Sequence, residues 1–263
     1  MLRRWLRTLV ALGPPVLLSI ALSVVGLFAA RLLIPMEVLR PANNEVGNYL
    51  QTLGTIYAVL LAFVVFMVWS QFNDARTLIE REANELVDLH RAASGLPAAD
   101  GAPIQADIEE YVGVVLEREW TAMARGDEAA LEEGGRVLDR MWGHIVAVEP
   151  GTECHRSLFD EILARFNDLS DARTGRLSSS RMRIPLALRM LIYAGSMFVV
   201  ASMYLLAVDS FALHAVMTGA LAGAISHVLY VVADLDNAFS GDWQVPRAAF
   251  ERVARWIKRG PLV

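Results

Sequence analysis

The 263-residue chain has a single cysteine, Cys154, so it cannot form an internal disulfide. Its neighbours Glu153 and His155 lack the ligand spacing of a zinc site, and we expect a plain thiol. The common catalytic patterns are also missing, since the sequence has no G-x-S-x-G, H-E-x-x-H, Walker A or dinucleotide-binding fingerprint. The sequence therefore predicts no catalytic residue and argues against an enzyme.

Basic residues are outnumbered in the middle of the chain. Residues 71–183 carry 13 Arg against 22 Asp or Glu, a net charge of −9. Binding to a phosphate backbone needs a basic face, so this composition excludes nucleic acid as a partner.

Apolar residues are abundant, at 55% of the chain with a mean hydropathy of +0.39, which indicates a membrane protein. Four apolar runs are long enough to span a bilayer, at residues 9–33, 53–69, 186–208 and 211–232. The first run follows a basic N-terminus, as in a signal peptide. It is longer than a signal peptide core and ends at Arg31 and Pro35 rather than at small residues, so we expect a retained span.

The distribution of basic residues predicts the topology. Arginines and a lysine flank the spans at both termini and on the side of residues 71–183, whereas the two loops within the span pairs hold only Arg40 and, at one edge, Arg31. The positive-inside rule then places both termini and the middle segment in the cytoplasm of a multi-pass inner (plasma) membrane protein.

The second span has no helix breaker at its end. No Gly or Pro lies between Thr55 and Arg91, although the sequence turns from apolar to charged there. From Thr52 to Arg91, about 40 residues at roughly 1.5 Å each give a helix of about 60 Å, twice the thickness of the hydrocarbon core. We expect one helix that crosses the bilayer and continues into water.

The fold class predicted is all-α, with four transmembrane helices and a cytoplasmic helical bundle built on extensions of the second and third spans. After a break at SGLPAADGAP, periodic patterns predict helices over residues 104–124 and 127–148 and from an N-cap at Thr152 toward Arg183, with Gly134 and Gly135 weakening the middle one. An amphipathic C-terminal helix either lies on the membrane or docks on the bundle. The predicted domains are residues 1–70 and 184–233 for the two transmembrane pairs, 71–183 for the bundle, and 234–263 for a turn and the C-terminal helix.

The second span offers the candidate pore lining. Val59, Phe63, Phe66, Met67 and Ser70 fall on adjacent helical faces. In a symmetric oligomer, rings of Phe63 and Phe66 would form an apolar constriction that gates by dewetting. The alternative is that these side chains face lipid or neighbouring helices.

The fourth span carries two further patterns. Ala215, Gly219 and Gly223 have the small-residue spacing that lets another helix approach closely. Three polar residues follow toward the end of the span, His227, Tyr230 and Asp234. They form either a polar path for a proton or ion, or ordinary hydrogen bonds.

Asp234, Asp236 and Asp242 bracket a turn after the fourth span. Clustered carboxylates suit calcium, but the spacing is not that of an EF-hand loop. The alternative is that they cap helices or hold arginines. No other cofactor is expected.

Several stretches resemble the bestrophin-like bacterial membrane proteins: YAVLLAFVVFMVWSQFNDARTLIEREANELVDLHRAASGLP, YVGVVLEREWTAMARG, FNDLSDARTGRL and DLDNAFSGDWQVPRAAFERV. They cover nearly the whole chain in order. The last contains an acidic, aromatic and glycine turn, with Asp234, Asp236, Phe239, Gly241 and Asp242, that is similar to the turn after the last span of true bestrophins.

True bestrophins are pentameric anion channels whose pore is lined by the second span. The resemblance therefore implies a homo-oligomeric ion channel of the lipid bilayer, a pentamer with ions as its partners. The alternative hypothesis is a membrane-anchored interaction or sensing module that acts through its acidic cytoplasmic bundle.

Overall fold

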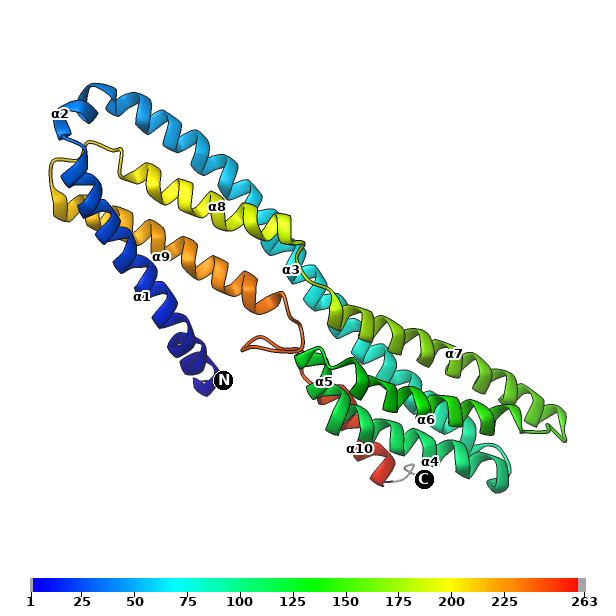
Figure 1. The fold of residues 1–263 in the computed structure, drawn as a ribbon. Coiled ribbons are helices and arrows are strands. Elements are labelled where there is room, and N and C mark those ends of the chain that lie inside the picture. The colour runs from blue at the N-terminus through cyan, green and yellow to red at the C-terminus, as the bar shows by residue number, and fades with distance from the viewer. Residues whose placement is uncertain (1, 260–263) are drawn as a thin grey trace. The chain divides into compact units, whose positions relative to one another are not determined.

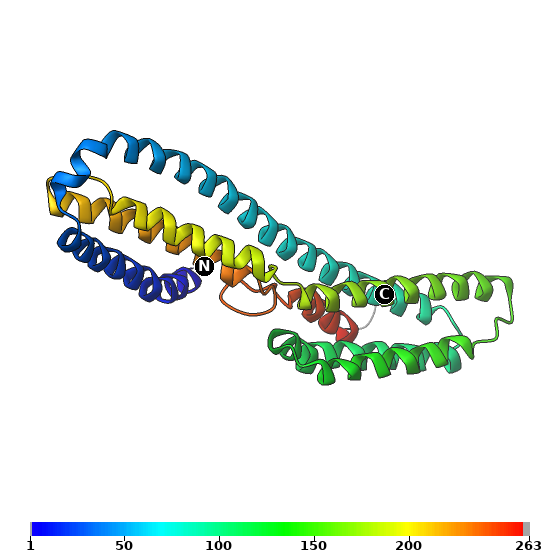
Figure 2. The same cartoon turned by 45° about the horizontal axis from the view of Figure 1, so that its top comes forward.

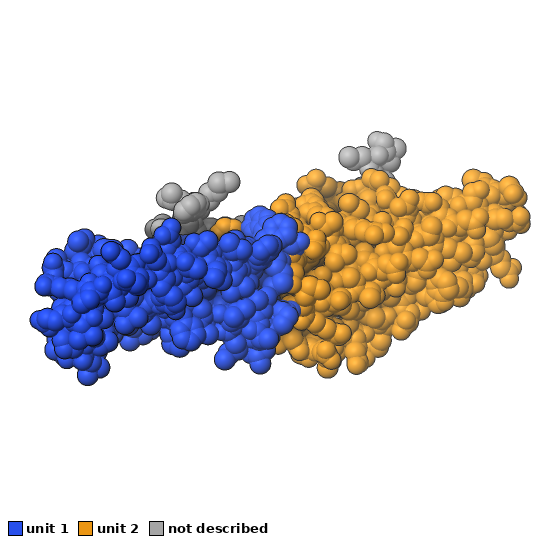
Figure 3. Space-filling model, turned by 90° about the horizontal axis from the view of Figure 1, so that it is seen from above, with its two compact units in different colours: residues 1–70, 183–236 blue, residues 71–182, 237–263 orange. Residues whose placement is uncertain are grey.

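The computed structural model describes residues 2–259, with side chains from Leu12 onward, and every regular element in that range is helical. The chain divides into two compact units (Figure 3). Unit 1 comprises residues 1–70 and 183–236, and unit 2 comprises residues 71–182 and 237–263.

Unit 1 consists of apolar helices that run side by side (Figures 1 and 2). They are α1 (Leu2–Leu33), the first part of α3 (Asn43–Ser94), α8 (Leu186–Met203) and α9 (Phe211–Leu235). All four are long and apolar enough to cross a membrane, which confirms the predicted spans. The short helix α2 (Met36–Leu39) and the 3₁₀ turn η1 (Arg40–Ala42) link α1 to α3.

Helix α3 is longer than predicted. It is unbroken over 52 residues and begins at Asn43 rather than near Thr52. Pro41 and Gly47 stand before Thr52, and both residue types disfavour a helix interior. Pro41 lies in the η1 turn before the helix, and a single interior glycine costs only about 1 kcal/mol, so neither residue stops α3.

Unit 2 is a helical bundle around the second part of α3. Its other elements are α4 (Ala98–Val114), the π-helical turn η2 (Val115–Glu119), α5 (Trp120–Arg125), α6 (Glu128–Val146), α7 (Glu153–Arg181) and α10 (Ala248–Arg259). The predicted cap of α7 is confirmed, because the Thr152 hydroxyl accepts a hydrogen bond from the His155 amide at 3.2 Å.

Two helix boundaries in unit 2 differ from the predicted ones. Helix α4 begins at Ala98 rather than at residue 104, and Pro103 lies inside the helix, which continues although the proline cannot donate a backbone hydrogen bond there. Helix α7 ends at Arg181, and the non-helical residues 182–185 separate it from α8. The helix before the third span is therefore a separate element.

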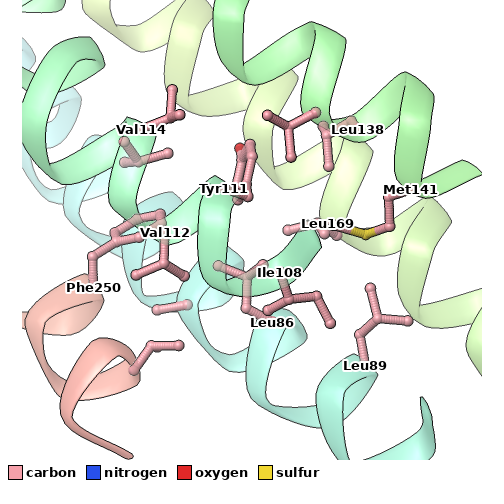
Figure 4. Close-up of a cluster of buried hydrophobic side chains, with 14 of the residues drawn as sticks. Leu86, Leu89, Ile108, Tyr111, Val112, Val114, Leu138, Met141, Leu169 and Phe250 are labelled. Carbon is pink, nitrogen blue, oxygen red and sulfur yellow. The ribbon is translucent and has the colours of Figure 1, made fainter. Parts of the chain in front are cut away.

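The core of unit 2 joins all of its long helices (Figure 4). Leu86, Ile108, Met141 and Leu169 come from α3, α4, α6 and α7, and each is fully buried. Burying one such side chain contributes about 1.5–3 kcal/mol, which holds the bundle together without disulfides.

The C-terminal helix α10 docks on this bundle through its apolar stripe. Ala249, Phe250 and Val253 are buried in the same core, and the Trp256 ring packs edge-to-face on His90 with centroids 5.1 Å apart. Of the two alternatives left by the sequence, the structure shows docking.

Candidate functional site

The apolar half of α3 has one buried and one exposed face. Val64 and Val68 are buried, whereas Val59, Phe63 and Phe66 are 53%, 70% and 70% exposed. Of the other two candidate pore residues, Met67 and Ser70 are each half-buried. The structure thus places the two phenylalanines on a face of α3 that no other part of the described chain covers.

The opposite face of α3 is fixed against α8. The Tyr57 hydroxyl donates to the Ile192 carbonyl at 3.1 Å, and the Tyr57 ring lies where α8 carries Gly195. A Cβ at Gly195 would stand 2.7 Å from the ring, so the glycine is what permits this approach. This contact sets which face of α3 remains uncovered.

The glycines of α9 lie against α1. A Cβ at Gly219 would meet Ile20 at 3.2 Å, and one at Gly223 would meet the same side chain at 3.0 Å. Ala215 is half-buried on this helix. Further along α9, His227 is exposed, and Tyr230 and Asp234 are half-buried.

Asp236 holds the start of α8 to the end of α9. Its buried carboxylate accepts from the Ile184 amide and from Arg189 Nη2, both at 2.6 Å. Asp234 is half-buried and Asp242 is exposed, and within residues 2–259 no group of three or more His, Cys, Asp or Glu side chains is arranged to hold a metal ion. These contacts are the capping arrangement, and the calcium hypothesis gains no support from the geometry.

A polar contact that the sequence did not reveal lies at the other end of unit 1. His214 is fully buried between Arg31 Nη2, 3.1 Å from its Nδ1, and the Met203 carbonyl, 2.8 Å from its Nε2. A guanidinium only donates and a carbonyl only accepts, so the ring is neutral with its proton on Nε2. Arg31 also donates to the Val208 carbonyl, and the contact therefore ties α1 to the α8–α9 hairpin.

Unit 2 contains a buried charge network that the sequence also did not reveal. Two acids, Glu82 of α3 and Glu119 of η2, meet two arginines of α7, Arg173 and Arg176. The side chains of Glu82, Glu119 and Arg176 have no exposed area, and that of Arg173 is 7% exposed. Tyr111 of α4 completes the network, because its hydroxyl donates to Glu82 and accepts from Arg173.

Arg176 is the centre of the network. It donates to Glu82 through Nε at 2.6 Å and Nη2 at 3.1 Å, and to Glu119 Oε2 through Nη2 at 2.7 Å. Its guanidinium carbon also lies 5.7 Å from the centroid of the Phe250 ring of α10. Four segments, α3, η2, α7 and α10, are therefore joined through one side chain.

Arg173 holds the second half of the network. Its Nη1 donates to Glu119 Oε2 at 2.9 Å and to the Tyr111 hydroxyl at 3.1 Å, and its Nη2 donates to the Leu131 carbonyl at 2.7 Å. Glu119 Oε1 lies 2.8 Å from the same Nη2, although not at a hydrogen-bonding angle.

The two signs of charge compensate each other in this network. Burial alone would lower the pKa of Arg176, but Glu82, Tyr111 and Glu119 raise that pKa well above its ordinary value. Burial, and then the charge of Glu82, raise the pKa of the Tyr111 hydroxyl. Arg176 therefore stays charged and Tyr111 stays a neutral donor.

Sequence and fold place the chain in a known class. Four apolar spans together with a separate helical bundle define a polytopic all-α membrane protein. The sequence matches the Bestrophin-like domain over residues 17–250, so the chain belongs to the bestrophin-like family. No curated protein matches it.

The fold is similar to crystal structures of a bacterial bestrophin homologue from Klebsiella pneumoniae. One of them, phased with zinc, has a TM-score of 0.71 at 14% identity and covers 91% of this chain and 96% of that one. Two structures of single-residue variants have TM-scores of 0.69, at 14% and 13% identity, and cover 91% and 93% of this chain and 96% and 98% of theirs. At this identity the likeness establishes the shared fold.

Proposed function

We propose that the protein is an ion channel of the inner (plasma) membrane, assembled as a homo-oligomer with the apolar half of α3 around a central pore. The observation that carries the proposal is the uncovered face of α3 in a bestrophin fold, with Phe63 and Phe66 each 70% exposed. Around a symmetry axis these side chains would form apolar rings, and such constrictions gate by dewetting. By resemblance to bestrophins, we infer that the oligomer is a pentamer and the permeant ions are anions.

Channel activity predicts unitary currents from the full chain in planar bilayers. Phe63→Ala and Phe66→Ala are expected to raise the conductance or the open probability severalfold, because a wider and less apolar constriction stays wet. Phe198→Ala is the matched control, since Phe198 of α8 is 62% exposed on another span. No current from an oligomer, or equal effects at Phe198 and at the α3 positions, would contradict α3 as the pore wall.

We further propose that both termini and unit 2 lie in the cytoplasm, which the excess of arginine at that end of the spans supports. The one cysteine of the chain, Cys154, is exposed in unit 2 and reports on this directly. A membrane-impermeant maleimide should label Cys154 in inside-out vesicles and after detergent, but not in intact cells. Labelling of intact cells would reverse the orientation, and Cys154→Ser is the control for specificity.

A further inference from the structure

We propose that unit 1 binds a membrane phospholipid in the groove between α1, α8 and α9, with an acyl chain along the groove and the phosphate on Arg189. The proposal does not depend on ion conduction. It requires only that unit 1 spans a bilayer.

The groove is large, apolar and open. Its volume is about 640 Å³, and its lining includes Leu18, Leu22 and Met197, which are 60%, 62% and 66% exposed. No other part of the described chain closes it. Because the three helices are membrane spans, the medium that surrounds this opening is hydrocarbon.

The groove runs along most of α8. Along this helix the lining extends from Tyr193 to Tyr204, which at about 1.5 Å per residue is roughly 17 Å, more than half of the ~30 Å hydrocarbon core. The Tyr204 hydroxyl ends the groove against α1, at 2.6 Å from where a Cβ of Gly26 would stand. A single extended acyl chain follows this path.

The serine side chains of the lining are turned to backbone rather than to a ligand. Ser23 and Ser196 donate to Ile20 and Tyr193 carbonyls at 2.8 and 2.6 Å. Ser19 and Ser226 donate across the α1–α9 interface at 3.4 and 3.5 Å. With their protons used in this way, the hydroxyls leave a surface suited to methylene groups rather than to a polar molecule.

An arginine lies at the Tyr193 end of the groove. A smaller cavity of about 150 Å³ shares Tyr193 and Ala233 with the groove and is lined by Arg189 and Asp236. Asp236 fixes one nitrogen of Arg189, but a guanidinium has five N–H donors and this side chain is 43% exposed.

A lipid phosphate fits this end better than a free anion does. Arg189 is paired here with Asp236 at 2.6 Å, so the charges of this pair balance and charge alone gives a free phosphate ion little attraction. A phospholipid gains the burial of its chain as well as the Arg189 contact, and each buried methylene contributes about 0.8 kcal/mol.

Native mass spectrometry of the full chain tests the proposal. The protein is equilibrated in nanodiscs that contain phosphatidylcholine with equal small amounts of phosphatidylglycerol and diacylglycerol, and retained lipid is counted after release. We expect wild type to retain either phospholipid over diacylglycerol, which lacks a phosphate. Arg189→Gln should reduce that preference by at least about tenfold, as for the loss of one charge-assisted hydrogen bond, while Arg189→Lys keeps part of it. Ala201→Trp, which fills the groove, should reduce retention of all three lipids.

Matched controls separate the site from general effects. Arg40→Gln removes an arginine that pairs with Asp209 in unit 1 away from the groove, and Val216→Trp adds a ring at a 68% exposed position outside the groove lining. Both should behave as wild type. Equal retention of phospholipid and diacylglycerol by wild type, or Arg189→Gln indistinguishable from Arg40→Gln, would overturn the headgroup site. If lipid is retained only by single chains that have dissociated from the oligomer, a second copy of the chain fills the groove in the oligomer. A melting curve for each variant verifies folding.

Discussion

Replacing Arg176 with methionine is expected to destabilise the protein by about 3–5 kcal/mol. The substitution leaves the carboxylate of Glu82, which has no exposed area, without its two hydrogen bonds from Arg176, at 2.6 and 3.1 Å. Removing one member of a buried ion pair costs this much because the other charge stays in a low-dielectric interior. In thermal unfolding of the full chain in detergent, the midpoint should fall by roughly 10 °C.

A second arginine on the same pair of helices is the control. Arg81 of α3 pairs with Asp168 of α7 at 2.9 Å, but the two side chains are 53% and 42% exposed. Arg81→Met should therefore cost no more than about 1 kcal/mol. If it costs as much as Arg176→Met, burial of the charges is not the cause of the effect.

The double variant Glu82→Leu with Arg176→Met distinguishes the stability contributed by the whole ion pair from the cost of leaving one of its charges unpaired. Replacing a whole buried pair with apolar side chains is often nearly neutral, so the double variant should recover most of the stability that Arg176→Met loses. Losses that simply add would show that the two residues do not depend on each other.

The spans and the continuity of α3 could be predicted because both depend on local sequence. A membrane span is a property of about 20 consecutive residues, and the absence of Gly and Pro between Thr55 and Arg91 is visible without any partner. The helix starts at Asn43 and Ala98 were misjudged, because α3 continues through Gly47 and α4 continues through Pro103, although both residue types disfavour a helix interior.

The buried network depends on partners that are remote in sequence. Glu82 and Arg176 are 94 residues apart, and periodicity shows which face of a helix a residue occupies but not what lies opposite. One signal was present: Glu82 shares a helical face with the buried Ile79, Leu86 and Leu89, where a charge needs a partner. The arginines of α7 were instead counted only as topology signals.

Whether Phe63 and Phe66 line a pore depends on neighbouring chains. A single chain shows that the two side chains are uncovered, and this exposure is compatible both with a central pore axis and with contact to lipid. This part of the candidate site stays a prediction, because the surroundings of these side chains in an oligomer depend on neighbouring copies that neither the sequence nor a single chain contains.

Adjacent glycines in α6 should respond in opposite directions to the same substitution. The sequence suggested that Gly134 and Gly135 both weaken the helix. In the structure, a Cβ at Gly134 would stand 2.2 Å from Glu119 Oε1 and 2.7 Å from Arg173 Nη1, whereas one at Gly135 would meet nothing within 4 Å. Gly134→Ala should therefore destabilise by about 3 kcal/mol, because the methyl group must displace a buried ion pair. Gly135→Ala should stabilise by about 0.5–1 kcal/mol, as expected for alanine in a helix interior.

A third variant tests whether the network causes the loss at Gly134. Glu119→Ala removes the carboxylate that the new methyl group would strike, so Gly134→Ala should cost less in that background than in wild type, and the difference measures the coupling between the two positions. Chemical unfolding of the four proteins in one detergent gives the cycle. An unchanged cost would mean that α6 tolerates no side chain at residue 134 for reasons of helix packing alone. A reduced cost would mean that this glycine exists to let the π-helical turn η2 bring Glu119 against Arg173, since a local π-helix re-aims the side chains that follow it.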